Sequence, residues 1–246
     1  MPPIRFITVV LCLTVLTISS ASAQTFKIKK RNKNIPGQRA IVYDERLSAL
    51  RTQPDVKAEL ISRLHRDREV GIIGVARSIK GGPDFFPIAV SRNMRGWIIV
   101  EALARPQRAQ DAKRLMGVIE DTKDDFTRTR LARLAADQFR GMSVAAVALL
   151  TLGKAAEQAS IKLSRDARKR AGEPDEVTDK NLSERDFMLN FVGLDRYNKL
   201  GVTFNYNNDS LIYDGAAYRE ILQKYPRSHE AAEARTLLEK LKPVKK

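Results

Sequence analysis

The hydrophobic pattern of the chain changes its period at Pro106. Before Pro106, short apolar runs such as residues 70–73 and 97–100 alternate with turn residues, which is typical of short β-strands. After Pro106, apolar residues recur every three or four positions, as they do on one face of a helix. The sequence therefore predicts an α+β protein of two domains, each with its own core: a strand-built domain over residues 37–105 and a helical domain over residues 108–242.

Residues 1–23 have the pattern of a secretory signal peptide. A basic Arg5 precedes an apolar stretch over residues 6–18, and the segment ends in the small residues Ala-Ser-Ala. The apolar stretch is shorter than the roughly 20 residues that a transmembrane helix needs, so cleavage near Ala23 is favoured over a retained anchor. The only cysteine, Cys12, would leave with this segment. We expect a periplasmic or secreted protein with no transmembrane anchor after cleavage.

The chain is strongly basic, with 44 Lys and Arg against 29 Asp and Glu and a formal net charge of +15. Basic residues are concentrated in a leader over residues 24–36 and in a tail over residues 240–246, and both are predicted to be flexible. Such ends favour anionic surfaces, and a charged, solvated surface is the alternative interpretation. No basic helix with base-reading side chains and no aromatic platform in a basic groove is found, so specific nucleic-acid binding is not predicted.

Three stretches of the strand-built region occur in an order that a known family shares. They are "LSALRTQPD" (47–55), "ISRLHRDREVGIIG" (61–74) and "RGWIIVEAL" (95–103). The region resembles bacterial SH3-type domains. The resemblance implies a small β-barrel that binds peptidoglycan, wall polymers or protein partners. Closure into a barrel is also how a small sheet of short strands avoids exposed edges.

The single tryptophan, Trp97, has two possible roles. The resemblance to SH3-type barrels implies that Gly96 supplies the backbone freedom for a tight turn and that the Trp97 ring covers one end of a small core. Alternatively, it could belong to a surface patch whose aromatic rings stack on a sugar or peptide while arginines pair with carboxylate or phosphate. The candidate ligand-binding residues of this patch are Tyr43, Arg51, Phe85, Phe86, Arg95 and Trp97.

The clearest helical unit is "AAYREILQKYPRSHEAAEARTLLEKL" (216–241). It has two apolar stripes separated by Pro226 and by Ser228, a candidate helix cap, which predicts an αα-hairpin. The segment resembles a tetratricopeptide-type repeat, and residues 131–156 resemble it weakly. Two divergent hairpins are fewer than the three or more units of a self-supporting solenoid, so we expect a compact helical domain.

Two other features of the helical region are predicted. The apolar run at residues 144–152 is too short to span a membrane and indicates a buried helix. Residues 202–206 and 211–213 flank an Asn-Asn-Asp-Ser turn, which predicts an inserted β-hairpin.

Little in the sequence indicates catalysis. The mature chain would lack cysteine and has two histidines, His65 and His229, both in polar segments. Asp124 and Asp125 are interpreted as charges at a helix N-terminus, where the helix dipole favours them. The oxygen-rich stretch at 205–209 could hold calcium, but a turn explains it equally well. We therefore predict no catalytic residue, no metal site and no cofactor.

The first hypothesis is a non-enzymatic exported adaptor or scaffold, in which the barrel docks on the cell wall or on a partner protein and the helical hairpins present a groove for a second protein. The alternative is a module that binds peptidoglycan or another anionic wall polymer directly through the barrel. Aromatic and arginine side chains would carry that binding.

Overall fold

The computed structural model describes residues 35–172, 193–207 and 210–241. The predicted signal peptide, most of the predicted leader and the end of the basic tail lie outside the described residues. Within them, an antiparallel sheet over residues 38–104 is followed by helices, so the predicted mixed α+β class and the change at Pro106 are confirmed.

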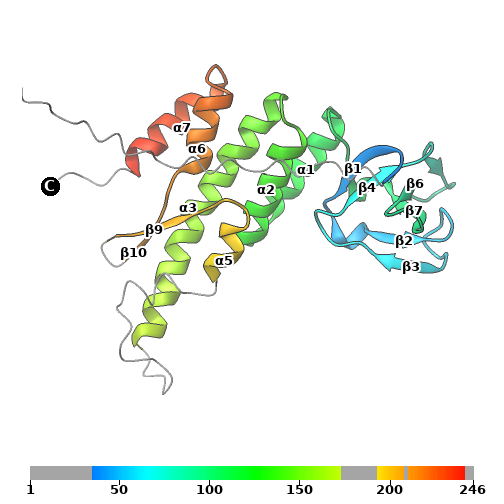
Figure 1. Cartoon of the computed structure of the whole chain (residues 1–246), viewed down its shortest axis with the longest axis horizontal. Helices are drawn as coiled ribbons and strands as arrows, with labels where there is room; N and C mark the ends of the chain where they lie inside the picture. Colours follow the sequence, from blue (N-terminus) through cyan, green and yellow to red (C-terminus); the bar gives the residue numbers. More distant parts are fainter. Residues whose placement is uncertain (1–34, 173–192, 208–209, 242–246) are drawn as a thin grey trace, which may run out of the picture. The chain divides into compact units, whose positions relative to one another are not determined.

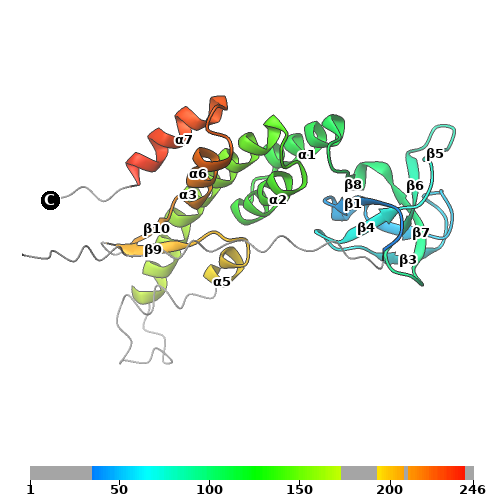
Figure 2. The same cartoon turned by 45° about the horizontal axis from the view of Figure 1, so that its top comes forward.

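The sheet contains eight short strands joined only by antiparallel pairs. They are β1 (Gln38–Val42), β2 (Ala49–Arg51), β3 (Leu60–Arg63), β4 (Glu69–Ile72), β5 (Arg77–Ser78), β6 (Asp84–Ala89), β7 (Arg95–Ile99) and β8 (Leu103–Ala104). Their order is β3-β2-β7-β6-β4-β1-β8, and β5 pairs with β6 beside this path (Figures 1 and 2). Two 3₁₀ turns, Glu45–Leu47 and Val100–Ala102, connect strands.

The sheet does not close into a barrel, so the predicted closed barrel is wrong. The path ends at β3 on one side and β8 on the other, and no hydrogen-bonded pair joins these strands in the described part of the chain. A physical reason is that β8 is only two residues long and is followed within a few residues by a helix. The carbonyl of Ala104 accepts a hydrogen bond from the Gln138 side chain at 2.8 Å rather than from another strand.

The helical region contains α1 (Ala109–Asp121), α2 (Asp125–Gln138), α3 (Ser143–Gly172), α5 (Gly193–Asn198), α6 (Ala216–Lys224) and α7 (His229–Lys240). The predicted β-hairpin is present as β9 (Phe204–Asn207) paired with β10 (Ser210–Tyr213). Helix α3 runs alongside α2 and also packs on α6 and β10 (Figures 1 and 2). The predicted αα-hairpin is formed by α6 and α7, but the Ser228 hydroxyl makes no capping hydrogen bond.

Small side chains and edge-on aromatic rings pack the interior of the helical region. Five rings form a continuous chain of edge contacts with centroids 5.1 to 6.4 Å apart: Phe126, Tyr197, Phe204, Tyr213 and Tyr218. At the end of this chain, the Tyr218 hydroxyl donates to Glu157. A Cβ on Gly153 would lie 2.2 Å from the Tyr218 ring, so α3 requires a glycine where α6 crosses it.

One helix passes the length and composition criteria for a membrane span. It is the part of α3 over Ser143–Lys169, and most of its apolar window is buried inside the structure. Burial of the run at residues 144–152, which includes Leu149 and Leu152, confirms the buried helix that the sequence predicts. A mostly buried apolar helix is typical of a protein core.

The buried apolar residues form two clusters that do not follow the predicted division completely. One cluster contains only residues of the sheet region, including Val70, Ile88 and Ile98. The larger cluster contains the helical residues together with Ile41, Tyr43 and Ala104 of the sheet region. The division into two domains therefore stays a prediction.

A buried carboxylate lies where the chain passes from β8 into α1. Asp111 is fully buried and accepts hydrogen bonds from the backbone N–H and the guanidinium of Arg105 and from the guanidinium of Arg114. The Asp111–Arg105 and Asp111–Arg114 contacts are 2.7 and 2.6 Å. Burial alone would raise the pKa of Asp111, but the Arg105 hydrogen bonds and the nearby positive charges outweigh it and lower this pKa.

Candidate ligand-binding face

Neighbouring strands bring a set of polar and apolar side chains onto the same face of the sheet. In the register, Arg51 lies opposite both Leu60 and Trp97, and Trp97 lies opposite Pro87. Directly paired residues share a face, and alternate residues along β7 add Arg95. We call these residues, with Arg77 of β5, the outer face: Arg51, Leu60, Arg77, Pro87, Arg95 and Trp97. The intervening residues Phe86, Ile88 and Ile98 point into the sheet core.

Close approach of β2 and β7 makes this arrangement possible. A Cβ on Gly96 would lie 2.7 Å from the Arg51 carbonyl oxygen and 2.9 Å from Leu50 Cδ1. The close packing of β2 against β7 therefore explains the glycine at position 96. The sequence-based role of Gly96 in a tight turn is wrong, because Gly96 is a strand residue of β7 without a positive φ.

Three arginines of this face lie without a carboxylate partner. The Arg77 guanidinium carbon is 4.9 Å from the centroid of the Trp97 ring, in a cation–π arrangement. Arg51 Nη1 donates to the Ala58 carbonyl at 2.6 Å. Arg95 is exposed at the start of β7. Among the described residues, none of these three arginines forms an ion pair, so each retains donors for a ligand.

The structure brings together only part of the six-residue patch that the sequence predicts. Arg51, Arg95 and Trp97 share the outer face, and Trp97 is half-buried. Its ring is thus neither a core residue nor fully exposed. Phe85 lies on the same side by register, opposite Arg77 and Ile99, but it is fully buried and can only support the face.

The other two aromatic residues of the predicted patch lie elsewhere, which corrects that prediction. Tyr43 is buried in the cluster that contains the helical residues, and burial raises its pKa. Phe86 is buried in the sheet core, with the Arg105 guanidinium carbon 5.1 Å from its ring centroid. Neither ring is available for stacking on a ligand in this arrangement.

Sequence reasoning missed Arg77, Leu60 and Pro87 as members of this face. A signal for Arg77 existed, because the turn at residues 80–84 predicts a hairpin that places Arg77 beside Phe85. Strand β5 is only two residues long, which is too short to be recognised from its pattern.

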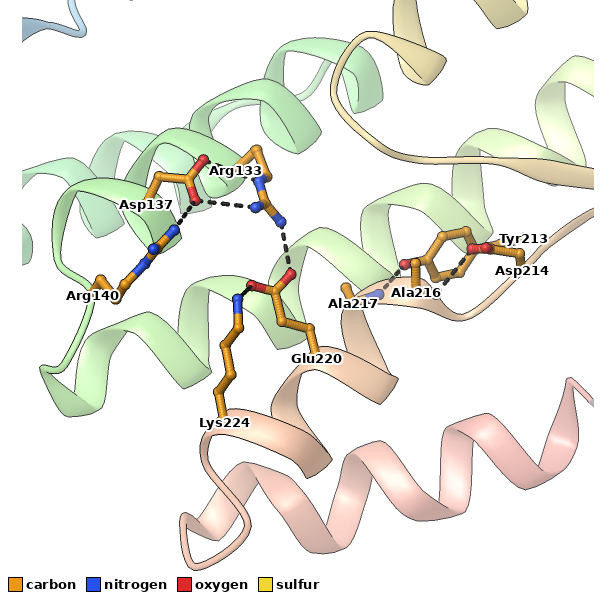
Figure 3. Close-up of polar contacts among 9 residues, drawn as sticks. All are labelled: Arg133, Asp137, Arg140, Tyr213, Asp214, Ala216, Ala217, Glu220 and Lys224. Carbon is orange, nitrogen blue, oxygen red and sulfur yellow. Dashed lines mark hydrogen bonds and ion pairs between the residues drawn. The ribbon is translucent and has the colours of Figure 1, made fainter. Parts of the chain in front are cut away.

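In the ion pairs between α2 and α6, the arginine contacts carboxylates, whereas the outer-face arginines do not. Arg133 contacts Asp137 at 3.1 Å and Glu220 at 2.8 Å, and Glu220 also contacts Lys224 at 2.6 Å (Figure 3). Burial would raise the pKa of Glu220, but its bonds to Lys224 and Arg133 lower it. Because these charges neutralise one another, the cluster fixes the α6–α7 hairpin to α2 and offers little to a ligand.

The α6 N-terminus is fixed in a similar way. The Tyr213 hydroxyl accepts a hydrogen bond from the Ala217 N–H at 2.6 Å, and Asp214 accepts one from the Ala216 N–H at 2.9 Å (Figure 3). Burial raises the pKa of Tyr213, so this hydroxyl remains protonated at ordinary pH.

The remaining candidates of the sequence have structural roles or fall outside the described residues. Asp124 accepts a hydrogen bond from the Thr127 N–H at the start of α2, as predicted, and this bond outweighs burial and lowers its pKa. Asp125 pairs with Lys162. His65 and His229 are exposed. Part of the oxygen-rich stretch is not described, and no cluster of three potential metal-ligating residues occurs in the part of the chain that is.

Comparison with protein-family models, with curated proteins and with solved structures found no match to this chain.

Proposed function

We propose that the protein is a non-enzymatic adaptor of the cell envelope that docks on an anionic wall polymer through the outer face of its sheet. The observation that carries this proposal is the stacking of Arg77 on Trp97, with Arg51 opposite the same tryptophan. The Trp97 ring is half-buried, and its accessible part offers a surface for a sugar ring, while guanidinium groups bind carboxylates or phosphates in two-point contacts.

Export to the periplasm or beyond the cell is part of this proposal and is supported by the sequence of residues 1–23. The SH3-type assignment of residues 37–105 is supported by the short antiparallel strands. The closed barrel that the resemblance implied is not part of this proposal, because the sheet is open.

The second part of the proposal is that the helical region holds a partner protein. Packing of α3 against both α2 and α6 supports a tetratricopeptide-like stack of two hairpins. The first helices of these hairpins are tied by the Arg133–Glu220 ion pair, so a partner would not bind between them without breaking it.

A sedimentation assay with purified peptidoglycan tests the polymer-binding component. We expect Trp97→Ala and Arg51→Gln to weaken binding about tenfold, because each removes a contact of roughly 1–2 kcal/mol. Arg235→Gln removes the same charge from an exposed position of α7 and should leave binding unchanged. Far-UV circular dichroism checks that each variant is folded.

A salt series separates the outer face from the basic chain ends. Binding through Trp97 should persist in part at about 0.5 M salt, where long-range attraction of the flexible ends is screened. Binding that disappears with salt and is the same in Trp97→Ala and Arg235→Gln would contradict the proposal.

A further inference from the structure

The two edges of the sheet differ sharply. At the β8 edge, Leu103 and Ala104 are fully buried, α1 packs on the strand, and Gln138 donates to the Ala104 carbonyl. At the other edge, β3 pairs only with β2 within the described part of the chain. Open edges present unpaired backbone groups to solvent, and proteins usually protect them.

Apolar side chains are concentrated at this open edge. Val56, Leu60 and Ile61 are 47%, 46% and 41% exposed. They make up three of the nine large hydrophobic residues that are exposed in the described structure, within six positions of the chain. The β2–β3 register shifts here, because Leu50 lies opposite Ser62 and Arg51 lies opposite Leu60, so Ile61 is an extra residue of this edge. Scattered apolar residues need no explanation, but exposed apolar residues that are close together in the chain at the open edge of β3 indicate a contact surface.

The charges beside these residues indicate which partner fits. Glu59 precedes β3 and Arg63 ends it, and both are exposed. If β3 pairs antiparallel with β3 of a second copy, Glu59 of each copy comes near Arg63 of the other, at both ends of the pair. Parallel pairing would instead bring like charges together, which is unfavourable. The strand is therefore complementary to itself in a two-fold arrangement.

We propose that β3 is a self-association edge, through which two copies of this chain pair antiparallel and extend the sheet across a two-fold axis. Each two-fold contact occurs twice, as in other symmetric dimers. The axis is perpendicular to the sheet, so the outer faces of both copies lie on the same side. This last consequence rests on the proposed function: two outer faces in one surface bind a repetitive polymer more tightly than one.

The strand is short, so we expect a weak dimer, because small interfaces belong to transient complexes. Sedimentation velocity of the purified protein from about 1 to 300 µM tests for it. We expect a concentration-dependent monomer–dimer equilibrium. Ile61→Lys should raise the dissociation constant about tenfold or more, because it places a charge in the apolar contact. Val75→Lys changes an aliphatic residue that is 81% exposed and lies away from β3, and should leave the equilibrium unchanged.

A charge exchange tests the pairing direction independently of apolar contacts. Glu59→Arg should weaken the dimer, because the guanidinium introduced in each copy then faces Arg63 of the other. The double variant Glu59→Arg with Arg63→Glu restores opposite charges and should recover the dimer. A monomer at all concentrations, larger assemblies in place of dimers, or a double variant no better than Glu59→Arg would overturn the proposal.

The two proposals fail separately. If the polymer binds the outer face, Ile61→Lys should still sediment with peptidoglycan, but several-fold more weakly, because only single-site binding remains. Trp97→Ala should lose polymer binding and still dimerise. If Ile61→Lys loses dimerisation and polymer binding is unchanged, the proposed β3 dimer would stand, but its contribution to polymer binding would be rejected.

Discussion

On the outer face of the sheet, the guanidinium groups of Arg51 and Arg77 contact a backbone carbonyl and an indole ring, whereas in the helical region Arg133 lies between the carboxylates of Asp137 and Glu220. The same type of side chain, arginine, thus has two different kinds of surroundings in this protein. Arginine carries five N–H donors. In the helical region these donors are directed at carboxylates, and on the outer face most of them remain available.

If the outer face binds a ligand as proposed, this difference places stability and binding in separate arginines. Removing an arginine from a partly buried cluster leaves carboxylates that have lost solvent and partner, which is costly. Removing an exposed arginine that faces no carboxylate changes the folded state little, but it changes the charge presented to a ligand. The arginines of the chain therefore have different surroundings, and substitutions can distinguish them.

The largest effect is expected where arginine donors converge on a buried carboxylate. Asp111→Ala leaves Arg105 and Arg114 without their shared partner and should reduce the free energy of unfolding by about 3–5 kcal/mol. Chemical denaturation monitored by circular dichroism measures this loss. The control is Asp121→Ala, an exposed carboxylate at the end of the same helix, with a change within about 0.5 kcal/mol. A loss below about 1 kcal/mol for Asp111→Ala would show that the ion pairs do not stabilise the junction.

Protonation of Asp111 should cost part of that free energy. The pKa of Asp111 is lowered in the folded protein, so its stabilising contribution is complete above the unfolded value of about 3.9. It is lost as the pH falls from there through the folded-state pKa. Unfolding free energies of the natural chain and of Asp111→Asn, measured from pH 7 to pH 2, should converge as the pH falls. Parallel curves would contradict this assignment.

The next largest effect on stability is expected at a close contact between α3 and α6. Gly153→Ala places a Cβ against the Tyr218 ring and should destabilise the protein by about 1–3 kcal/mol. Gly117→Ala in α1 meets no atom within 4 Å and should stabilise it by up to about 1 kcal/mol, because alanine favours the helix. Thermal midpoints that shift in opposite directions in these two variants would confirm that α6 packs closely on α3. Equal shifts would show that this packing is loose.

The parts of the fold that local patterns specify were predicted correctly. The change from strands to helices at Pro106, the β9–β10 hairpin and the α6–α7 hairpin all arise from periodicity and turn residues within short windows. Barrel closure was not predictable in this way, because it depends on whether β3 and β8, about 40 positions apart, find each other.

The candidate site shows a similar limit. Phe85 and Phe86 are consecutive in a strand, so they must point to opposite faces, but the pattern does not show which side is covered. In the structure both are buried, because Phe86 enters the sheet core and Phe85 lies opposite Arg77 on the short strand β5. Tyr43 is buried with helical residues that are distant in sequence, and the local pattern contains no sign of them.

The most direct test of the comparison exchanges one arginine from each region for methionine, which keeps the length of the apolar stem. Arg133→Met should reduce the free energy of unfolding by about 1–2 kcal/mol, because Asp137 and Glu220 lose their shared partner and Glu220 retains only Lys224. Arg77→Met should change it by less than about 0.5 kcal/mol, since methionine can still contact the Trp97 ring. Polymer binding should change in the opposite order, with loss in Arg77→Met and none in Arg133→Met. Equal effects on stability would mean that the outer-face arginines also hold the fold together, and the separation of binding from stability would then be wrong.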